Sequence, residues 1–251
     1  MNFPIEIGVF SMFGMWLSAW VGGLLRKGLG PAGSDERDDL GLVDGATLTF
    51  LGLLIGFTFS MAITRYDQRK NYEEEEANAI GTEYLSADLL PAPNAAAVRQ
   101  LLAKFLNQRI LFYTARNEKE LATINAETTR LESEMWLQVK TAADAQPTTI
   151  SAVAVVGMND VLNREGYTQA AWWNRIPTSA WALLIVTAIC CNVLIGYGAR
   201  GDRGGAMLLI VFPVVVSISF LLIADIDAPR GGLIRIKPQN LLALSDSMPK
   251  Q

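Results

Sequence analysis

Four long apolar segments constrain the fold of this chain more than any other feature. Each approaches or reaches about 20 residues, the length that a helix needs to cross the hydrocarbon core of a bilayer. They run from Ile5 to Leu25, from Gly45 to Ile63, from Thr178 to about Gly198, and from Ala206 to Ala224, with Pro213 as the expected kink in the fourth. The first carries Glu6 and no basic residue before Arg26, which favours a retained helix over a signal peptide. The pattern predicts an integral membrane protein with four transmembrane helices and both termini on one side.

The rest of the chain is polar. Charged residues make up 18% of the sequence, below the roughly 25% typical of a soluble domain. Most of the polar sequence lies in residues 64 to 177, between the second and third spans, where helix-forming residues dominate. We therefore expect an all-α membrane protein with a helical cytoplasmic domain inserted there. The predicted organisation is 1–63 for the first two spans with an acidic outer loop over 26–44, 64–177 for the helical domain, 178–224 for the last two spans, and 225–251 for a cytoplasmic tail.

Breaks in the insert predict its helices. Pro91-Ala92-Pro93 and Gln146-Pro147 separate three helical stretches, and Asn94 suits the N-cap of the middle one. Within that stretch, apolar residues recur in steps of three and four, the pattern of packed helices. The residues of this seam are Leu121, Ile124, Thr128, Leu131 and Met135.

Basic residues near the span ends predict the orientation. The segments 26–44 and 199–205 hold five Lys or Arg, whereas eight lie close to the membrane on the opposite side. Because cytoplasmic flanks are enriched in Lys and Arg, both termini are expected in the cytoplasm.

Several functional classes can be set aside. The sequence contains no histidine, which removes the commonest general base and the usual zinc ligand. Cys190 and Cys191 are adjacent within an apolar run, so they suit small buried side chains and not a metal site. No phosphate-binding motif or nucleophile is recognisable, and the net charge of −4 gives no support for nucleic-acid binding. We expect no enzyme, no cofactor and no metal; an enzyme that uses Asp225 and Asp227 ranks third among the functions considered.

The second span carries two stripes with a spacing of four residues. One consists of small residues: Gly52, Gly56 and Ser60. The other holds larger ones: Thr49, Leu53, Phe57 and Met61. Small stripes let helices approach closely in lipid, so copies of this helix could surround an axis, with the larger stripe as an apolar constriction. The alternative is an ordinary buried helix of a four-helix bundle.

Charged residues follow the second span directly. Arg65 and Asp67 precede the run Glu73-Glu74-Glu75-Glu76. Such a run is commonly a solvated helix face, but around a pore mouth a ring of glutamates concentrates cations. Four consecutive residues cannot share one helix face, so at most two, Glu73 and Glu76, are assigned to a pore mouth together with Arg65 and Asp67.

Several segments resemble the bestrophin family. Gly56-Phe57-Thr58-Phe59-Ser60-Met61-Ala62-Ile63-Thr64-Arg65-Tyr66 is similar to the bestrophin pore helix, in which a Gly-Phe pair precedes a Thr-Arg-aromatic motif. Tyr66-Asp67-Gln68-Arg69-Lys70 and Ala77-Asn78 resemble the following helix of bacterial homologues. Asp225-Ile226-Asp227-Ala228-Pro229-Arg230-Gly231-Gly232-Leu233-Ile234-Arg235 and the EEANAIGT run are similar to bestrophin-like bacterial membrane proteins of uncharacterised function. The resemblance covers most of residues 45 to 245.

This resemblance implies a homo-oligomeric, pentameric ion channel of the bacterial plasma (inner) membrane, whose partners are its own copies, the lipid bilayer and permeant inorganic ions. The family's hydrophobic neck would fall on Thr49, Leu53 and Phe57, with Thr49 at a position that is usually hydrophobic. The acidic cluster that binds calcium in animal bestrophins has no counterpart, so no calcium gating is expected. The acids after the pore helix favour cations over anions.

Two other interpretations bear on the function. Ile195-Gly196-Tyr197-Gly198 matches the core of a potassium-channel filter, but it ends a continuous apolar span, so we interpret it as a Gly-rich helix end. The alternative function is a non-conducting membrane scaffold or sensor, in which the Glu73 to Glu76 run and the Leu121 to Met135 seam would bind a cytoplasmic protein.

Overall fold

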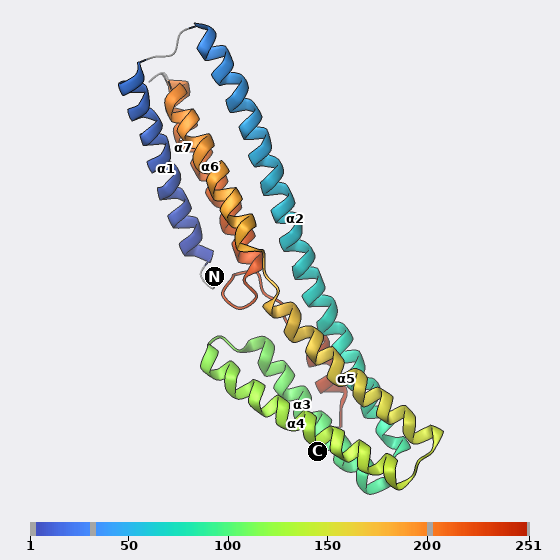
Figure 1. The fold of residues 1–251 in the computed structure, drawn as a ribbon. Coiled ribbons are helices and arrows are strands. Elements are labelled where there is room, and N and C mark those ends of the chain that lie inside the picture. The colour runs from blue at the N-terminus through green and yellow to red at the C-terminus, as the bar shows by residue number, and fades with distance from the viewer. Residues whose placement is uncertain (1–3, 31–33, 200–202, 250–251) are drawn as a thin grey trace. The chain divides into compact units, whose positions relative to one another are not determined.

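The computed structural model describes residues 4–30, 34–199 and 203–249, and these residues form helices and connecting loops without strands (Figure 1). In chain order the α-helices are α1 (Pro4–Leu29), α2 (Ser34–Ser86), α3 (Ala92–Thr114), α4 (Glu118–Ala145), α5 (Thr149–Trp173), α6 (Thr178–Gly198), α7 (Arg203–Asp227) and α8 (Gln239–Ser247). A short 3-10 helix, η1 (Ala87–Leu89), follows α2. The chain divides into two compact units, which are described separately below.

The four predicted spans are confirmed as helices long and apolar enough to cross a membrane. α6 has the predicted bounds, and α7 continues as a helix through Pro213. The predicted loop over 26–44 is wrong in extent, because α1 continues to Leu29 and α2 already begins at Ser34. Asp38 and Asp39 lie near that start, where the positive end of the helix dipole favours negative charge.

The membrane unit consists of Met1–Arg65 and Arg175–Ile234. In it α6 and α7 lie beside α1 (Figure 1). α1 and α6 meet backbone to backbone, because a Cβ atom on Gly22 would lie 2.1 Å from the carbonyl oxygen of Val193, and one on Gly196 would lie 2.1 Å from that of Ala19. Small residues at such crossings let helices approach closely in lipid, where water does not drive apolar surfaces together. The Gly-Tyr-Gly sequence is therefore the end of a helix at a close crossing.

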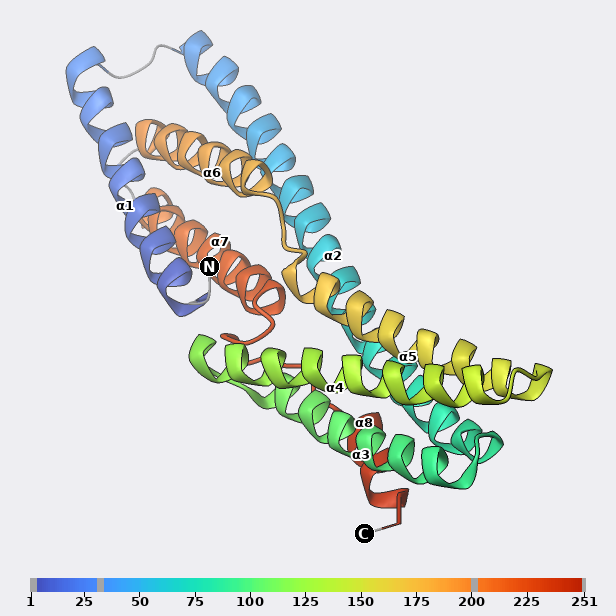
Figure 2. The same ribbon diagram turned by 60° about the horizontal axis from the view of Figure 1, so that its bottom comes forward.

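The polar unit consists of Tyr66–Asn174 and Arg235–Gln251. It contains the rest of α2 with η1, α3, α4, α5 and α8, and α3 and α4 run side by side (Figure 2). The predicted middle stretch is two helices, because the chain turns between Thr114 and Glu118. Asn117 caps α4 by accepting a hydrogen bond from the backbone N–H of Glu120 at 2.7 Å. Asn94, predicted as a cap, lies inside α3, whose N-cap position is Pro91.

A single apolar core fills the polar unit. It includes Phe105, Leu131, Met135 and Met158, each fully buried. The predicted seam on α4 is confirmed, since Ile124, Thr128, Leu131 and Met135 are buried and Leu121 packs against the core. Full burial of each large apolar side chain stabilises the fold by about 1.5–3 kcal/mol.

The predicted C-terminal tail, 225–251, is divided between the two units. Residues 225–234 belong to the membrane unit, where the carboxylate of Asp225 accepts hydrogen bonds from the backbone N–H groups of Leu233 at 2.7 Å and Ile234 at 2.8 Å. Residues 235–251 belong to the polar unit, where Ile236 and Leu241 enter its core.

Candidate pore helix and buried charge network

The membrane part of α2 has one packed face and one unpacked face. Leu51, Thr58 and Ala62 are buried, and Leu51 belongs to a cluster with Leu184 and Cys191 of α6. The opposite face carries both predicted stripes, and all of their residues are exposed: Thr49, Gly52, Leu53, Gly56, Phe57, Ser60 and Met61. Phe57 is 69% exposed and Leu53 55%. The stripes are therefore free to meet something other than this chain.

The small stripe has no packing role within the chain. A Cβ atom added to Gly52 or Gly56 would meet no atom within 4 Å. This is the opposite of Gly22 and Gly196, where the backbone of another helix fills the space. The hydroxyl of Thr49 donates to the carbonyl oxygen of Gly45 at 2.8 Å, so its helix already satisfies that donor.

Exposed apolar residues on the other membrane helices are mostly large. α1 exposes Phe10, Phe13 and Trp20, and α7 exposes Met207 and Ile218. Bulky apolar faces suit contact with lipid chains. The exposed face of α2 differs, because small residues alternate with large ones along it. It has the character of a helix-packing surface.

The predicted pore-mouth residues take different positions in the structure. Asp67 is exposed and Arg65 is half-buried. Glu73 and Glu76 are buried, 1% and 0% exposed, and bind groups of the polar unit. Neither carboxylate faces solvent. The predicted role of these two glutamates as pore-mouth charges is therefore replaced by an internal one. A helix turns by about 100° per residue, so the members of a consecutive run point in different directions.

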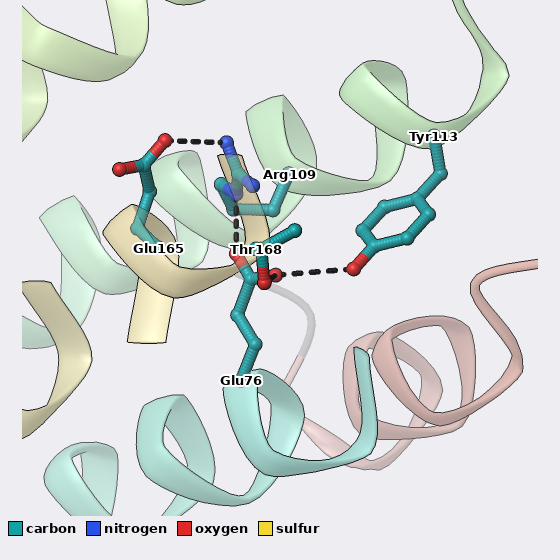
Figure 3. A network of polar contacts seen from close by, with 5 residues as sticks. All are labelled: Glu76, Arg109, Tyr113, Glu165 and Thr168. Atoms are coloured by element: carbon teal, nitrogen blue, oxygen red, sulfur yellow. Dashed lines mark hydrogen bonds and ion pairs between the residues drawn. The ribbon is translucent and has the colours of Figure 1, made fainter. Parts of the chain in front are cut away.

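Glu76 of α2 joins three helices of the polar unit (Figure 3). Its carboxylate pairs with the guanidinium of Arg109 on α3, and it accepts a hydrogen bond from Thr168 of α5 at 3.0 Å. The hydroxyl of Tyr113 lies 3.3 Å from the same carboxylate oxygen that Thr168 contacts. Arg109 also pairs with Glu165 of α5 at 3.0 Å. The ion pairs compensate charges that would be costly if they were buried alone.

Burial and neighbouring charges shift the pKa values in this network. Burial works to lower the pKa of Arg109, but Glu76 and Glu165 outweigh it and raise the pKa above its usual range. Burial, with a further contribution from Glu76, raises the pKa of Tyr113, so its phenol stays protonated. Burial and the nearby Glu165 raise the pKa of Glu132 to about 7. Three acids thus lie near the single arginine, and burial favours the neutral form of Glu132 and Glu165.

Glu73 of α2 holds the start of α8. One carboxylate oxygen accepts hydrogen bonds from the backbone N–H groups of Asn240 at 2.9 Å and Leu241 at 3.0 Å. The other accepts a hydrogen bond from the side-chain amide of Asn240 at 2.6 Å. The first N–H groups of a helix have no partner within it, and a carboxylate satisfies them and the helix dipole together. Glu73 therefore fixes the C-terminal helix to α2.

The sequence carries a signal for this network outside the motifs described above. Arg109 lies at helical spacing among Leu102, Phe105, Leu106 and Phe112, which are all buried. A charged residue in the middle of a buried helix face requires an ionic partner. That requirement points to an acid on a neighbouring helix, and Glu76 supplies it.

A family model covers the part of the chain just described. The model of the Bestrophin-like domain matches residues 34–241. The chain belongs to the bestrophin-like family. The match begins where α2 begins, and takes in both stripes of the candidate pore helix and the charge network of this bestrophin-like protein.

Solved structures of bacterial bestrophin homologs share the fold. A homolog from Klebsiella pneumoniae is 16% identical, with a TM-score of 0.64, and the alignment covers 96% of this chain and 99% of that one. A single-residue variant of a homolog from Klebsiella pneumoniae is 14% identical, with a TM-score of 0.63, and covers 97% of this chain and 98% of that one. No match was found among curated proteins. The family match and the apolar helices identify an integral membrane protein of bestrophin-like fold.

Proposed function

We propose that this bestrophin-like protein is a homo-oligomeric ion channel whose pore is lined by α2. The observation that carries the proposal is the unpacked face of α2, where a small stripe and a large stripe run together although the opposite face is packed. Several copies arranged around an axis would bury this face. Gly52, Gly56 and Ser60 would let neighbouring copies approach closely, and the larger stripe would then border the axis.

Leu53 and Phe57 would form the narrow part of this pore. An apolar ring excludes water when it is narrow and admits ions when it widens, so it can act as a gate. Thr49 would extend the ring toward the N-terminal end of the span. It suits an apolar ring because its hydroxyl already donates a hydrogen bond to the carbonyl oxygen of Gly45. Met61 would border the pore one turn after Phe57.

Cation preference remains a part of the proposal, but fewer residues support it. Glu73 and Glu76 are bonded inside the polar unit, which leaves Asp67 and Glu74 as exposed acids shortly after the span. Arg65 and Lys70 lie in the same stretch and oppose them. We place the pore mouth at Asp67. Both termini would lie on the cytoplasmic side of a bacterial inner membrane.

The experiment that tests the proposal is current measurement on the purified protein in planar bilayers. We expect current above empty-membrane controls, and a reversal potential toward that of the cation under a salt gradient. Phe57→Ala should change the conductance or the gating, because it removes the largest side chain of the proposed ring. Phe13→Ala is a matched control, because Phe13 is 65% exposed on α1 and has no place in the ring.

Absence of current across voltages and gradients would contradict the channel, and equal effects of the two substitutions would contradict the pore-lining role of α2. The scaffold alternative loses the seam, because Ile124 to Met135 are buried in the core. Its other surface is reduced to Glu74 and Glu75, because Glu73 and Glu76 are buried. A non-conducting monomer or dimer would favour that alternative.

A further inference from the structure

Glu83 is a second buried acid on α2, and it is separate from the charge network. It lies in the polar unit, is 0% exposed, and neither carboxylate oxygen has a hydrogen-bond partner among the residues that the structure describes. An ionised carboxylate in such a place gives up the solvation of water and receives no donor or positive charge in return. The neutral form is the one that this environment favours.

The carboxyl group lies directly against Gly157 of α5. A Cβ atom on Gly157 would be 2.1 Å from Oε2 of Glu83 and 3.2 Å from its Cδ atom. Glycine is therefore the residue that lets α5 approach the carboxyl group. At this contact α2 and α5 pack together, with the titratable carboxyl group of Glu83 against the backbone of Gly157.

Charged groups on the neighbouring elements are engaged elsewhere. Asp88 of η1 pairs with Arg99 of α3, and Asp160 of α5 pairs with Arg164 at 3.2 Å. Arg99 also lies over the ring of Tyr84, 5.2 Å from its centroid. Burial alone raises the pKa of Glu83, to about 8.

We propose that Glu83 is a buried proton-binding site: its neutral carboxyl group permits the packing of α2 on Gly157, and loss of the proton loosens this contact. When the pH is above the ordinary pKa of a glutamate, the unfolded chain has released the proton of Glu83. The folded protein still holds it. The stability from this site is therefore complete at acid pH and falls as the pH rises toward about 8. Since α2 also carries the proposed pore face, the contact would make the channel sensitive to alkaline pH, and this last step rests on the proposed function.

The first test is thermal unfolding of the full chain in detergent from about pH 6 to about pH 9. We expect the wild-type midpoint to fall as the pH rises, and Glu83→Gln, which imitates the neutral acid, to remove the largest part of that fall. Glu74→Gln is the control, because Glu74 is exposed on the same helix. Glu132 and Glu165 also have raised pKa values and contribute in the same direction, so the quantity compared is the difference between variants. An unchanged slope in Glu83→Gln would overturn the proposal.

Hydrogen exchange of the wild-type protein supplies a second measurement that needs no variant. Residues 77–90 and 150–161 should lose protection at alkaline pH, after correction for the intrinsic exchange rate, while residues 124–139 of α4 keep theirs. This readout is independent of any current, so a failure here is distinguishable from failure of the channel. Equal protection of the three segments at both pH values would overturn the proposal.

Substitutions at glycine test the contact itself. Gly157→Ala should lower the unfolding midpoint, because the methyl group displaces the carboxyl group of Glu83. Gly166→Ala, on the same helix, should not lower it, because a Cβ atom there would meet nothing within 4 Å. The penalty of Gly157→Ala should disappear when Glu83→Ala is added. Equal effects of the two glycine substitutions would contradict the contact.

Discussion

Individual glutamates in the run from Glu73 to Glu76 have different partners, although they are neighbours of identical chemistry. Glu73 binds the start of α8, Glu75 pairs with Arg164 of α5, and Glu76 pairs with Arg109 of α3. Glu74 faces solvent. At the scale of residues, charge alone does not decide the role of a glutamate. Its role depends on the direction in which its side chain leaves the helix.

Arg109→Met should be among the most destabilising single changes in the polar unit. It leaves Glu76 and Glu165 without their cation, and breaking a buried ion pair from one side costs about 3–5 kcal/mol. The measurement is the free energy of unfolding in detergent. Arg130→Met is the control, since Arg130 also pairs with two glutamates but on the surface.

Adding Glu76→Leu to Arg109→Met should recover part of the lost stability, because two apolar side chains replace an unpaired charge. An effect of Arg109→Met as small as that of Arg130→Met would show that the network adds little to stability.

The sequence alone could predict that the second span carries two stripes, but it could not place the acids that follow. Their roles depend on which helices pack against α2, and their partners lie far along the chain, in residues 109–113, 164–168 and 240–241. Burial of Glu83 was equally hidden, since it depends on a glycine more than 70 residues away.

Helices pack by different chemistry in the two units. In the membrane unit, α1 and α6 meet through glycines. In the polar unit, α4 presents an apolar seam to a core that includes large side chains. At the scale of elements, glycines set the closest crossing in the membrane unit, and large apolar residues fill the core of the polar unit.

Gly22→Ala should weaken the packing of α1 on α6. The added methyl group would lie 2.1 Å from the carbonyl oxygen of Val193, so the helices must separate, which we expect to cost roughly 1–3 kcal/mol. Gly23→Ala is a control on the adjacent residue, because its Cβ atom would be 4.0 Å from its nearest neighbour. The thermal midpoint in detergent should fall for the first variant and stay close to wild type for the second; equal midpoints would contradict the crossing.

Element boundaries could be predicted where composition changes sharply. The spans were clear because apolar runs of that length have few other uses. The break between α3 and α4 was not, because neither proline nor glycine marks it. Its signal was Asn117 followed three residues later by Glu120, a helix start inside a continuous helical pattern.

At the scale of the whole molecule, the chain exposes a helix face that it does not use itself. A stripe of small residues that has no neighbour among the described residues would suit close packing against another copy. This supports the proposed oligomer, and a pentamer is the assembly that the family resemblance implies.

We expect a mass in detergent that corresponds to five chains of 27.4 kDa each. Gly56→Leu should reduce the assembly, because its side chain would fill the space left for the neighbouring copy, whereas Gly14→Leu on α1 should not. Gly14 also has open space around it but lies outside the stripe. The measurement is native mass after correction for bound detergent; a wild-type monomer, or an intact Gly56→Leu assembly, would contradict the prediction.

The position of α8 sets the order in which the protein can be completed during synthesis. The polar unit takes most of its sequence from residues 66–174, but its core also needs Leu241, and Glu73 needs the first N–H groups of α8. Between these parts the ribosome makes α6 and α7, which must enter the bilayer. The polar unit therefore cannot finish folding when only residues 66–174 have emerged from the ribosome. Its core is complete only once α8 has also been synthesised, because Leu241 is part of that core.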